Sequence, residues 1–286
     1  MNTSVLNLIA YKNGEYKPLG EIGPSVLDFG FIHCDATYDV MPVYDGKAFC
    51  YNKHLQRFKN SAERFGLTLP YNNPLDIIKQ LKIKNNITVD AFVWFLAWRG
   101  YPPSGNPRDL ENCPVHFAMY IKPSYPIGKT PVVSICLDEN TNRVSDDYYG
   151  QEFKNMAWIE LTMSQRNRLE GYDTTVLVDV NGNVTEGPGF NVGIVLGCPP
   201  YQQARIYTAD KNVLKGVTMS VVEDIALAKD IPFVRKPITK KEFLEADEVF
   251  IASSSGGVTA TTKSGPITEL LIKEYQNRKF MYGTEL

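Results

Sequence analysis

The hydrophobic pattern of residues 52–67 predicts an amphipathic helix in the first part of the chain. Its apolar residues recur at intervals of three and four, the spacing of one helix face: Leu55, Phe58, Ala62 and Phe65. Asn52 is a suitable N-cap and Gly66 a suitable stop, so we expect the helix to begin and end close to these residues. A second amphipathic stretch around residues 74–82 predicts another helix.

Strands are expected on both sides of these helices. Asn13-Gly14 and Asp45-Gly46 each stand between β-prone residues, and such dipeptides favour two-residue hairpin turns. Residues 89–97 form a dense apolar and aromatic run typical of a buried strand, and residues 115–121 predict another. Residues 100–107 are rich in proline and glycine and are expected to form a loop.

The second half of the chain predicts a further set of strands and helices. We expect strands over 132–137 and 248–252, helices over 156–169, 218–228 and 267–275, and a hairpin around Asn181-Gly182. Thr218 is expected to cap the second of these helices. A linker over residues 122–130 is predicted to join an N-terminal domain of residues 1–121 to a C-terminal domain of residues 131–286. The pattern therefore favours an α+β fold in two domains.

Composition and charge exclude several classes of function. The chain of 286 residues carries 30 Lys and Arg against 32 Asp and Glu, so its formal net charge is −2 and gives no reason to expect nucleic acid or an anionic membrane as partner. No run approaches the roughly 18 apolar residues of a transmembrane helix, and the first residues lack a signal-peptide pattern. The five cysteines lack CxxC spacing, which favours reduced thiols in the cytoplasm, and no metal site is expected.

Candidate chemistry is spread over single residues, each of which has an ordinary structural explanation. Thr218 at a helix start and the turn Ser253–Gly257 could hold an anion, although most helix starts and polar turns bind nothing. Glu186 precedes a Gly-Pro-Gly break, where a solvated turn is the usual interpretation. Lys154 before an apolar helix and Arg57 on a helix face are, by themselves, ordinary surface charges.

The order of these residues resembles that of fold-type IV pyridoxal-phosphate (PLP) enzymes, which include branched-chain aminotransferases, D-amino-acid aminotransferases and (R)-selective amine transaminases. The resemblance covers residues 20–275 and rests on five blocks: Asp28–Val40 with the helix that contains His54, Arg57 and Ser61; Lys154-Asn155 with Trp158; Val184–Val192; Leu214–Thr218; and Ala246–Phe250 with Ser253–Gly257. The Gly-Pro-Gly-Phe-Asn form of the third block is most similar to (R)-amine transaminases.

This resemblance implies a PLP site and a particular fold. It makes Lys154 the catalytic residue that holds PLP as a Schiff base and moves the substrate proton, and Glu186 the partner of the pyridine nitrogen. Arg57, the Val217 and Thr218 amides, the Thr218 hydroxyl and Ser254 are implied to hold the phosphate. The other implied cofactor contacts are Phe190, Asn191, Leu214 and Gly216. The implied architecture is a smaller N-terminal α/β domain and a larger C-terminal pseudo-barrel domain.

The resemblance also implies a substrate pocket and an oligomer. The implied pocket residues are His33, Tyr38, Phe92, Trp94, Arg108, Trp158, Ser253 and Ser255. In this family the strand that carries Tyr38 usually reaches in from the partner subunit. The expected assembly is therefore a homodimer with the active site at the subunit interface.

Two departures from the family pattern concern the rim of this pocket. Members that bind a substrate carboxylate usually have a basic residue in the loop over residues 101–107, and this loop has none. Arg108 comes three positions later, and Arg99 is the other candidate anchor. Met219 stands where arginine is usual, and the hairpin after Ser253–Gly257 is shortened to Ala260–Gly265.

The implied function is that of a PLP-dependent aminotransferase working by ping-pong half-reactions. An (R)-amine or D-amino acid is favoured as donor and a 2-oxo acid as acceptor. An L-branched-chain aminotransferase and an aminodeoxychorismate lyase-like enzyme are the alternatives. The lyase is less favoured, because Tyr38 replaces a smaller hydroxyl residue and Trp94 and Trp98 would crowd a bulky acid. The intact Lys154–Glu186 pair argues against a silent PLP-binding protein, and five ordered blocks argue against an unrelated binding module.

Overall fold

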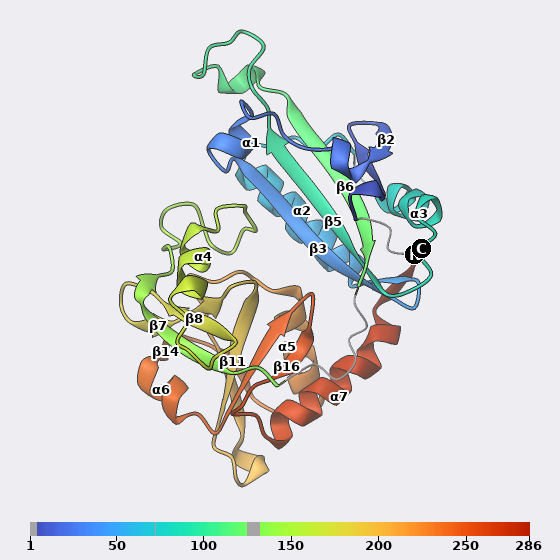
Figure 1. The fold of residues 1–286 in the computed structure, drawn as a ribbon. Coiled ribbons are helices and arrows are strands. Elements are labelled where there is room, and N and C mark those ends of the chain that lie inside the picture. The colour runs from blue at the N-terminus through green and yellow to red at the C-terminus, as the bar shows by residue number, and fades with distance from the viewer. Residues whose placement is uncertain (1–4, 72, 125–131) are drawn as a thin grey trace. The chain divides into compact units, whose positions relative to one another are not determined.

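The computed structural model describes residues 5–71, 73–124 and 132–286, and the chain divides into two compact units (Figure 1). The first unit comprises Met1–Pro126, Lys154–Ala157 and Tyr282–Leu286, and the second comprises Ile127–Phe153 and Trp158–Met281. Most of the expected linker, residues 122–130, lies outside the described residues. The segment that begins with Lys154 belongs to the first unit, although its neighbours on both sides in sequence belong to the second.

An antiparallel sheet is the frame of the first unit. Its strands in the described ranges follow the order β17-β4-β3-β5-β6-β1-β2. Their bounds are β1 (Ile9–Lys12), β2 (Glu15–Pro18), β3 (Ala36–Tyr44), β4 (Lys47–Phe49), β5 (Ala91–Arg99), β6 (Val115–Pro123) and β17 (Gly283–Glu285). The predicted turns Asn13-Gly14 and Asp45-Gly46 join β1 to β2 and β3 to β4, and all four residues have the positive φ that such tight turns require.

Two helices, α2 (Tyr51–Arg64) and α3 (Leu75–Lys84), cover one face of this sheet (Figure 1). Successive side chains of a strand point to opposite faces, so the odd-numbered residues of the central strands enter the core with the helices. Met41, Phe95 and Phe117 belong to this buried cluster. The even-numbered residues of β3 and β5 therefore lie on the opposite face. A short helix, α1 (Phe29–Ile32), precedes β3.

The second unit contains two sheets. In its described residues the larger sheet has the order β13-β12-β11-β15-β16 with β10 beside β11, and the smaller has the order β14-β9-β8-β7. The strands are β7 (Ile135–Asn142), β8 (Thr174–Val178), β9 (Asn183–Val184), β10 (Glu186–Gly187), β11 (Phe190–Leu196), β12 (Arg205–Thr208), β13 (Phe233–Arg235), β14 (Ile238–Thr239), β15 (Glu248–Ser253) and β16 (Gly257–Ala260). The helices are α4 (Ile159–Arg166), α5 (Val217–Ala228), α6 (Lys240–Glu245) and α7 (Pro266–Met281). No helix within these ranges is long and apolar enough to cross a membrane.

Two predicted N-caps and one predicted helix start were wrong, each for a local reason. Helix α2 follows directly on Cys50, whose φ of 50° turns the chain into the helix, so Asn52 lies within the helix. Gly216, not Thr218, is the N-cap of α5. Helix α4 begins at Ile159 and not at residue 156, because the preceding residues lie against strand β3.

Helix α6 was not predicted, although its sequence carries a start signal. Thr239 and Glu242 form a capping box, in which the Thr239 hydroxyl accepts from the backbone N–H of Glu242 and the Glu242 carboxylate accepts from that of Thr239. The Thr-x-x-Glu spacing is the usual sign of such a box. The helix has six residues, too few for an apolar periodicity to be visible.

Candidate functional site

Lys154 lies on a segment that runs along the edge of strand β3. The backbone N–H of Met156 donates to the carbonyl of Ala36 at 3.3 Å, and the Thr37 hydroxyl donates to the carbonyl of Lys154 at 2.6 Å. From the other side, the backbone N–H of Lys154 donates to the Ser61 hydroxyl of α2 at 3.0 Å. Strand β3 and helix α2 thus fix the backbone of this lysine together.

A row of stacked aromatic side chains lies on the sheet face opposite α2 and α3. The ring centroids of Tyr38 and Trp94 are 5.7 Å apart with an interplanar angle of 14°, and those of Trp94 and Tyr120 are 5.6 Å apart with an angle of 11°. Phe92 lies two residues before Trp94 on β5, on the same face. Nζ of Lys154 lies 4.4 Å from the centroid of the Tyr38 ring, a favourable position for a cation. The row therefore places a flat apolar surface beside the amino group of this lysine.

A buried network of charges fixes Arg57. Its Nε and one terminal nitrogen donate to the two carboxylate oxygens of Asp39 at 2.7 and 2.8 Å, and Nδ1 of His54 lies 2.8 Å from Oδ1 of Asp39. Burial raises the pKa of Asp39, but the charges of Arg57 and His54 hold this pKa well below its usual range. Burial lowers the pKa of His54, against the opposing effect of Asp39. Arg57 is therefore an oriented, largely buried guanidinium and not a mobile surface charge.

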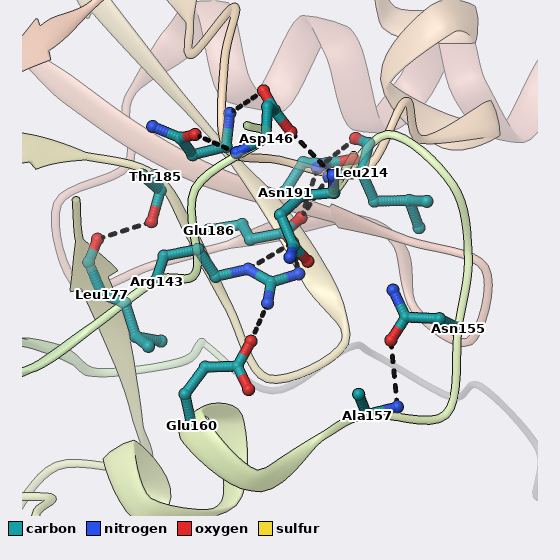
Figure 2. Close-up of polar contacts among 12 residues, drawn as sticks. Arg143, Asp146, Asn155, Ala157, Glu160, Leu177, Thr185, Glu186, Asn191 and Leu214 are labelled. Carbon is teal, nitrogen blue, oxygen red and sulfur yellow. Dashed lines mark hydrogen bonds and ion pairs between the residues drawn. The ribbon is translucent and has the colours of Figure 1, made fainter. Parts of the chain in front are cut away.

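Glu186 belongs to a buried cluster in the second unit (Figure 2). Its Oε1 accepts from two nitrogens of Arg143, at 3.1 and 2.8 Å, and its Oε2 accepts from Nδ2 of Asn191 and the backbone N–H of Leu214, both at 3.0 Å. A further nitrogen of Arg143 donates to Glu160. Arg143, Glu160 and Glu186 are each only 5 or 6 % exposed. Four donors therefore hold the Glu186 carboxylate in one orientation.

Asn191 connects this carboxylate to the start of helix α5. Its Nδ2 also donates to the carbonyl of Leu214 at 2.9 Å. A Cβ atom at position 216 would lie 1.9 Å from Oδ1 of Asn191, so only glycine fits there. Gly216 is the N-cap of α5 and has no side chain with which to cap it. The first backbone N–H groups of the helix, which include those of Val217 and Thr218, are therefore available to an anion such as phosphate.

The serines expected at the site lie in the turn between β15 and β16. Oγ of Ser253 accepts from the backbone N–H of Gly256 at 2.9 Å and lies 3.2 Å from Oγ of Ser255. Ser254 is the first residue of the turn itself. Gly257 ends the turn with a φ of 64°, a conformation that glycine adopts without strain. The turn is thus a compact group of hydroxyl and N–H groups.

These groups fit PLP, the cofactor that the sequence implies. The buried cluster contains one guanidinium and two carboxylates, so its charge with all three groups ionised is 1 − 2 = −1, which suits a protonated pyridine nitrogen. The start of α5 offers the kind of N–H donors that bind phosphate. Lys154 supplies a primary amine, the group that forms a covalent bond with an aldehyde.

Two aromatic residues expected at the site pack against the Gly187–Gly189 break. The Trp158 indole is 3.4 Å from where a Cβ of Gly189 would lie, and the Phe190 ring covers Gly187 so closely that a Cβ there would be 2.1 Å from it. Both glycines therefore allow aromatic rings to approach the strand that carries Glu186. Glu186 and Gly187 are thus buried at this break, whereas Gly189 is exposed.

The remaining candidates lie in the first unit and differ in their surroundings. His33 is the C-cap of α1 and is exposed. Arg108 is exposed in the loop between β5 and β6, where its backbone N–H donates to Asn106. Arg99 is held in place, since its Nε donates to Asp35 and a terminal nitrogen donates to the carbonyl of Phe65, both at 2.6 Å.

Sequence reasoning missed Arg143 and Glu160. Arg143 stands in a polar stretch without a motif, and Glu160 is an acidic residue in the first turn of α4, where a carboxylate needs no further explanation. The sequence shows only that Glu160 stands between two apolar residues, Ile159 and Leu161, and this does not identify the side chain with which Glu160 pairs. The fold brings Arg143 to Glu186 and Glu160 to Arg143.

Comparisons with known proteins identify the family of the chain. Residues 36–263 match the amino-transferase class IV family. Among curated proteins, the chain is 25 % identical to a putative branched-chain-amino-acid aminotransferase of Methanocaldococcus jannaschii, over 96 % of this chain and 98 % of that protein. It is 26 % identical to the D-alanine aminotransferase of Staphylococcus epidermidis, over 88 % of this chain and 87 % of that protein.

Solved structures of similar fold cover nearly the whole chain. The branched-chain aminotransferase of Thermoproteus uzoniensis with norvaline has a TM-score of 0.85 and 21 % identity, and covers 97 % of this chain and 98 % of its own. The branched-chain amino acid aminotransferase of Thermobaculum terrenum in its PLP form has a TM-score of 0.83 and 18 % identity, and covers 98 % of this chain and 99 % of its own. The mixed α+β fold is thus the fold of these enzymes.

Proposed function

Because this chain belongs to the amino-transferase class IV family, and is therefore a PLP-dependent transaminase, we propose that its donor is an (R)-amine or a D-amino acid and its acceptor a 2-oxo acid. The observation that carries the donor class is the aromatic row of Tyr38, Trp94 and Tyr120 beside Nζ of Lys154. A flat apolar surface suits the hydrocarbon part of an amine. The stereochemical preference is supported by the Gly-Pro-Gly-Phe-Asn block at residues 187–191 and by the D-alanine aminotransferase relatives.

The two arginines that could anchor a substrate carboxylate differ in their surroundings. Arg99 already donates to Asp35 and to the carbonyl of Phe65, and Arg108 is exposed on a loop. A carboxylate is most strongly held by an arginine that can present two donors to it. Because Arg99 is already held by these two bonds, it cannot present two free donors to a substrate carboxylate, which supports an amine as donor.

We assign the following roles to the cofactor residues. PLP, when bound, supplies an electron sink for the charge that develops at the amino-bearing carbon of the substrate. Nζ of Lys154 attaches the cofactor covalently and carries the proton that leaves this carbon. Glu186 keeps the ring nitrogen protonated. The phosphate is assigned to Arg57, Val217, Thr218 and Ser254, and supporting contacts are assigned to Phe190, Asn191, Leu214 and Gly216.

We assign the substrate pocket, assembly and location as follows. The pocket residues are His33, Tyr38, Phe92, Trp94, Arg108, Trp158, Ser253 and Ser255. The protein acts as a homodimer with its active site at the subunit interface, and the two sheets of the second unit form the pseudo-barrel domain. A cytoplasmic location is supported by the five cysteines, each of which is a free thiol.

An L-branched-chain aminotransferase is the second candidate, favoured by the Methanocaldococcus jannaschii relative and by the solved structures of similar fold.

A half-reaction assay separates the candidates. The purified protein with PLP is mixed with D-alanine, L-leucine, (R)-1-phenylethylamine or (S)-1-phenylethylamine, and the absorption of bound PLP is followed as it changes to that of pyridoxamine phosphate. Conversion by D-alanine or the (R)-amine alone supports the proposal. Conversion by L-leucine alone supports the branched-chain alternative, and no conversion with bound PLP supports a lyase.

A further inference from the structure

The guanidinium of Arg143 is shared between two buried carboxylates (Figure 2). It donates twice to Oε1 of Glu186, at 3.1 and 2.8 Å, and once to Oε1 of Glu160. These bonds join three segments: the residue after β7, the strand β10 and the first turn of helix α4. Because all three side chains are buried, water does little to stabilise any of the charges. Two carboxylates therefore compete for one positive charge.

Glu160 depends on this guanidinium more than Glu186 does. Oε2 of Glu186 has two further donors, Asn191 and Leu214. Oε2 of Glu160, in contrast, is buried and has no hydrogen-bond partner among the residues that the structure describes. A buried carboxylate oxygen without a donor carries a large desolvation cost. The bond to Arg143 is therefore the main stabilisation of a charge on Glu160, and it draws positive charge away from Glu186.

The other charged groups around the cluster leave this competition intact. Burial lowers the pKa of Arg143, but Glu186 and Glu160 raise it above its ordinary value, and Tyr149 acts in the same direction as these two carboxylates. Arg143 is therefore charged throughout the pH range in which a pyridine nitrogen titrates. With all three groups ionised the cluster has a charge of −1, and a protonated ring nitrogen brings it to zero.

We propose that Glu160 is a positioning residue for the cofactor: by sharing Arg143 it leaves Glu186 with enough negative charge to keep the ring nitrogen protonated. This rests on the proposed pairing of Glu186 with that nitrogen. Glutamine at position 160 changes the charge of the cluster to zero without the ring proton and to +1 with it. A buried site disfavours the added positive charge, so the ring nitrogen then loses its proton at a lower pH.

The test uses a probe that contains the ring and the phosphate but cannot react with Lys154. 4-Deoxypyridoxine 5′-phosphate lacks the aldehyde, and it is titrated into the full-length apoprotein between pH 6 and pH 10. Tryptophan fluorescence gives the affinity, and the near-ultraviolet absorption of the bound 3-hydroxypyridine ring reports whether its nitrogen carries a proton. In Glu160→Gln we expect the pKa of the bound ring nitrogen to fall by about one unit, with affinity about tenfold weaker at pH 6, where the ring nitrogen is protonated, and unchanged at the alkaline end, where it is not.

Control variants separate charge from structure. Glu152→Gln removes an equal charge from a more exposed residue that pairs with Lys215, and is expected to titrate like the wild type. Glu160→Leu removes both carboxylate oxygens and is expected to show the same shift in the pKa of the bound ring nitrogen as Glu160→Gln. It takes the place of Glu160→Gln if thermal melts show that variant to be unstable. Equal ring titration in the wild type and the Glu160 variants overturns the inference. A loss of affinity that is uniform in pH also overturns it, because that is the signature of a merely structural role. If the wild type does not bind the probe at all, the proposed PLP site itself is wrong.

Discussion

Arg57 and Asp39 form a two-point ion pair that ties helix α2 to strand β3. The two donor–acceptor distances are 2.7 and 2.8 Å, and Asp39 has no exposed surface. An arginine and a carboxylate paired in this way have little freedom to reorient. The same helix and strand hold the backbone of Lys154, through Ser61 and Thr37. The pair therefore stabilises the part of the first unit to which both the lysine and the arginine belong.

Asp39→Asn is expected to lower the free energy of unfolding by about 3 kcal/mol, because the largely buried guanidinium loses its carboxylate partner. Urea unfolding at neutral pH measures the loss. Glu63→Gln, an exposed position on the same helix, is the matched control and is expected to change stability by less than about 0.5 kcal/mol. Equal losses of unfolding free energy in the two variants would show that the buried ion pair contributes no more to stability than an exposed side chain.

Stability is expected to fall on acidification in two separate steps. The pKa of His54 is lowered in the folded protein, chiefly by burial, so below about pH 6.5 the unfolded chain binds the extra proton first and stability decreases. The pKa of Asp39 is also lowered, so its contribution is complete above about pH 4 and is lost as the pH falls further. Each unit of pKa difference corresponds to about 1.4 kcal/mol.

Unfolding measurements at pH 7.5, 6.0 and 5.0 test the first of these steps. In His54→Asn the side-chain amide can still donate to Asp39 but does not titrate, so this variant is expected to lose less stability than the wild type between pH 7.5 and 5.0. Parallel pH dependence in the two proteins would contradict the role given to His54.

Gly216→Ala is expected to weaken PLP binding and to cost about 1 to 3 kcal/mol of stability. The added Cβ would lie 1.9 Å from Oδ1 of Asn191, so either the loop before α5 or the amide that bonds Glu186 must move. Equilibrium titration of the apoprotein with PLP and urea unfolding measure the two effects. Gly23→Ala serves as the control for an added methyl group, because a new Cβ at that position would have no atom within 4 Å. Unchanged PLP affinity in Gly216→Ala would argue against a phosphate site at the start of α5.

Lys154→Ala is expected to fold normally but to lose covalent attachment of PLP. Its backbone bonds to Thr37 and Ser61 do not involve the side chain, so the segment along β3 keeps its position. Borohydride reduction of the PLP-loaded protein, followed by peptide mass spectrometry, locates the attachment. Labelling of the wild type at Lys154, and none in the variant, is the expected result. Labelling at another lysine would transfer the role to that residue.

The elements that could be predicted from the sequence are those with strong local signals. The turns Asn13-Gly14 and Asp45-Gly46 form where expected, because few residues other than asparagine, aspartate and glycine readily adopt the positive φ they need. The apolar face of α2 also packs as predicted, with Leu55, Phe58 and Ala62 in the core. The start of α4 could not be predicted, because residues 154–157 are drawn to strand β3 by contacts with residues more than a hundred positions earlier.

The candidate site was predictable only where several residues stand together in a recognisable block. The Glu186–Asn191 block is found directly, and the structure joins its two ends by a hydrogen bond across neighbouring strands. Arg143 and Glu160 have no such block, since Arg143 meets Glu186 and Glu160 only through the folding of separate segments. A buried ion pair between distant residues leaves no periodic pattern in a sequence, so tertiary structure is needed to find it.

The configuration of the alanine made from pyruvate tests the donor proposal most directly. The protein is loaded with pyridoxamine phosphate, mixed with pyruvate in a single turnover, and the alanine released is resolved by chiral chromatography. D-alanine is the expected product, because this reaction is the reverse of the half-reaction with the proposed D-amino acid donor. Release of L-alanine would contradict the proposal and assign the protein to the branched-chain type.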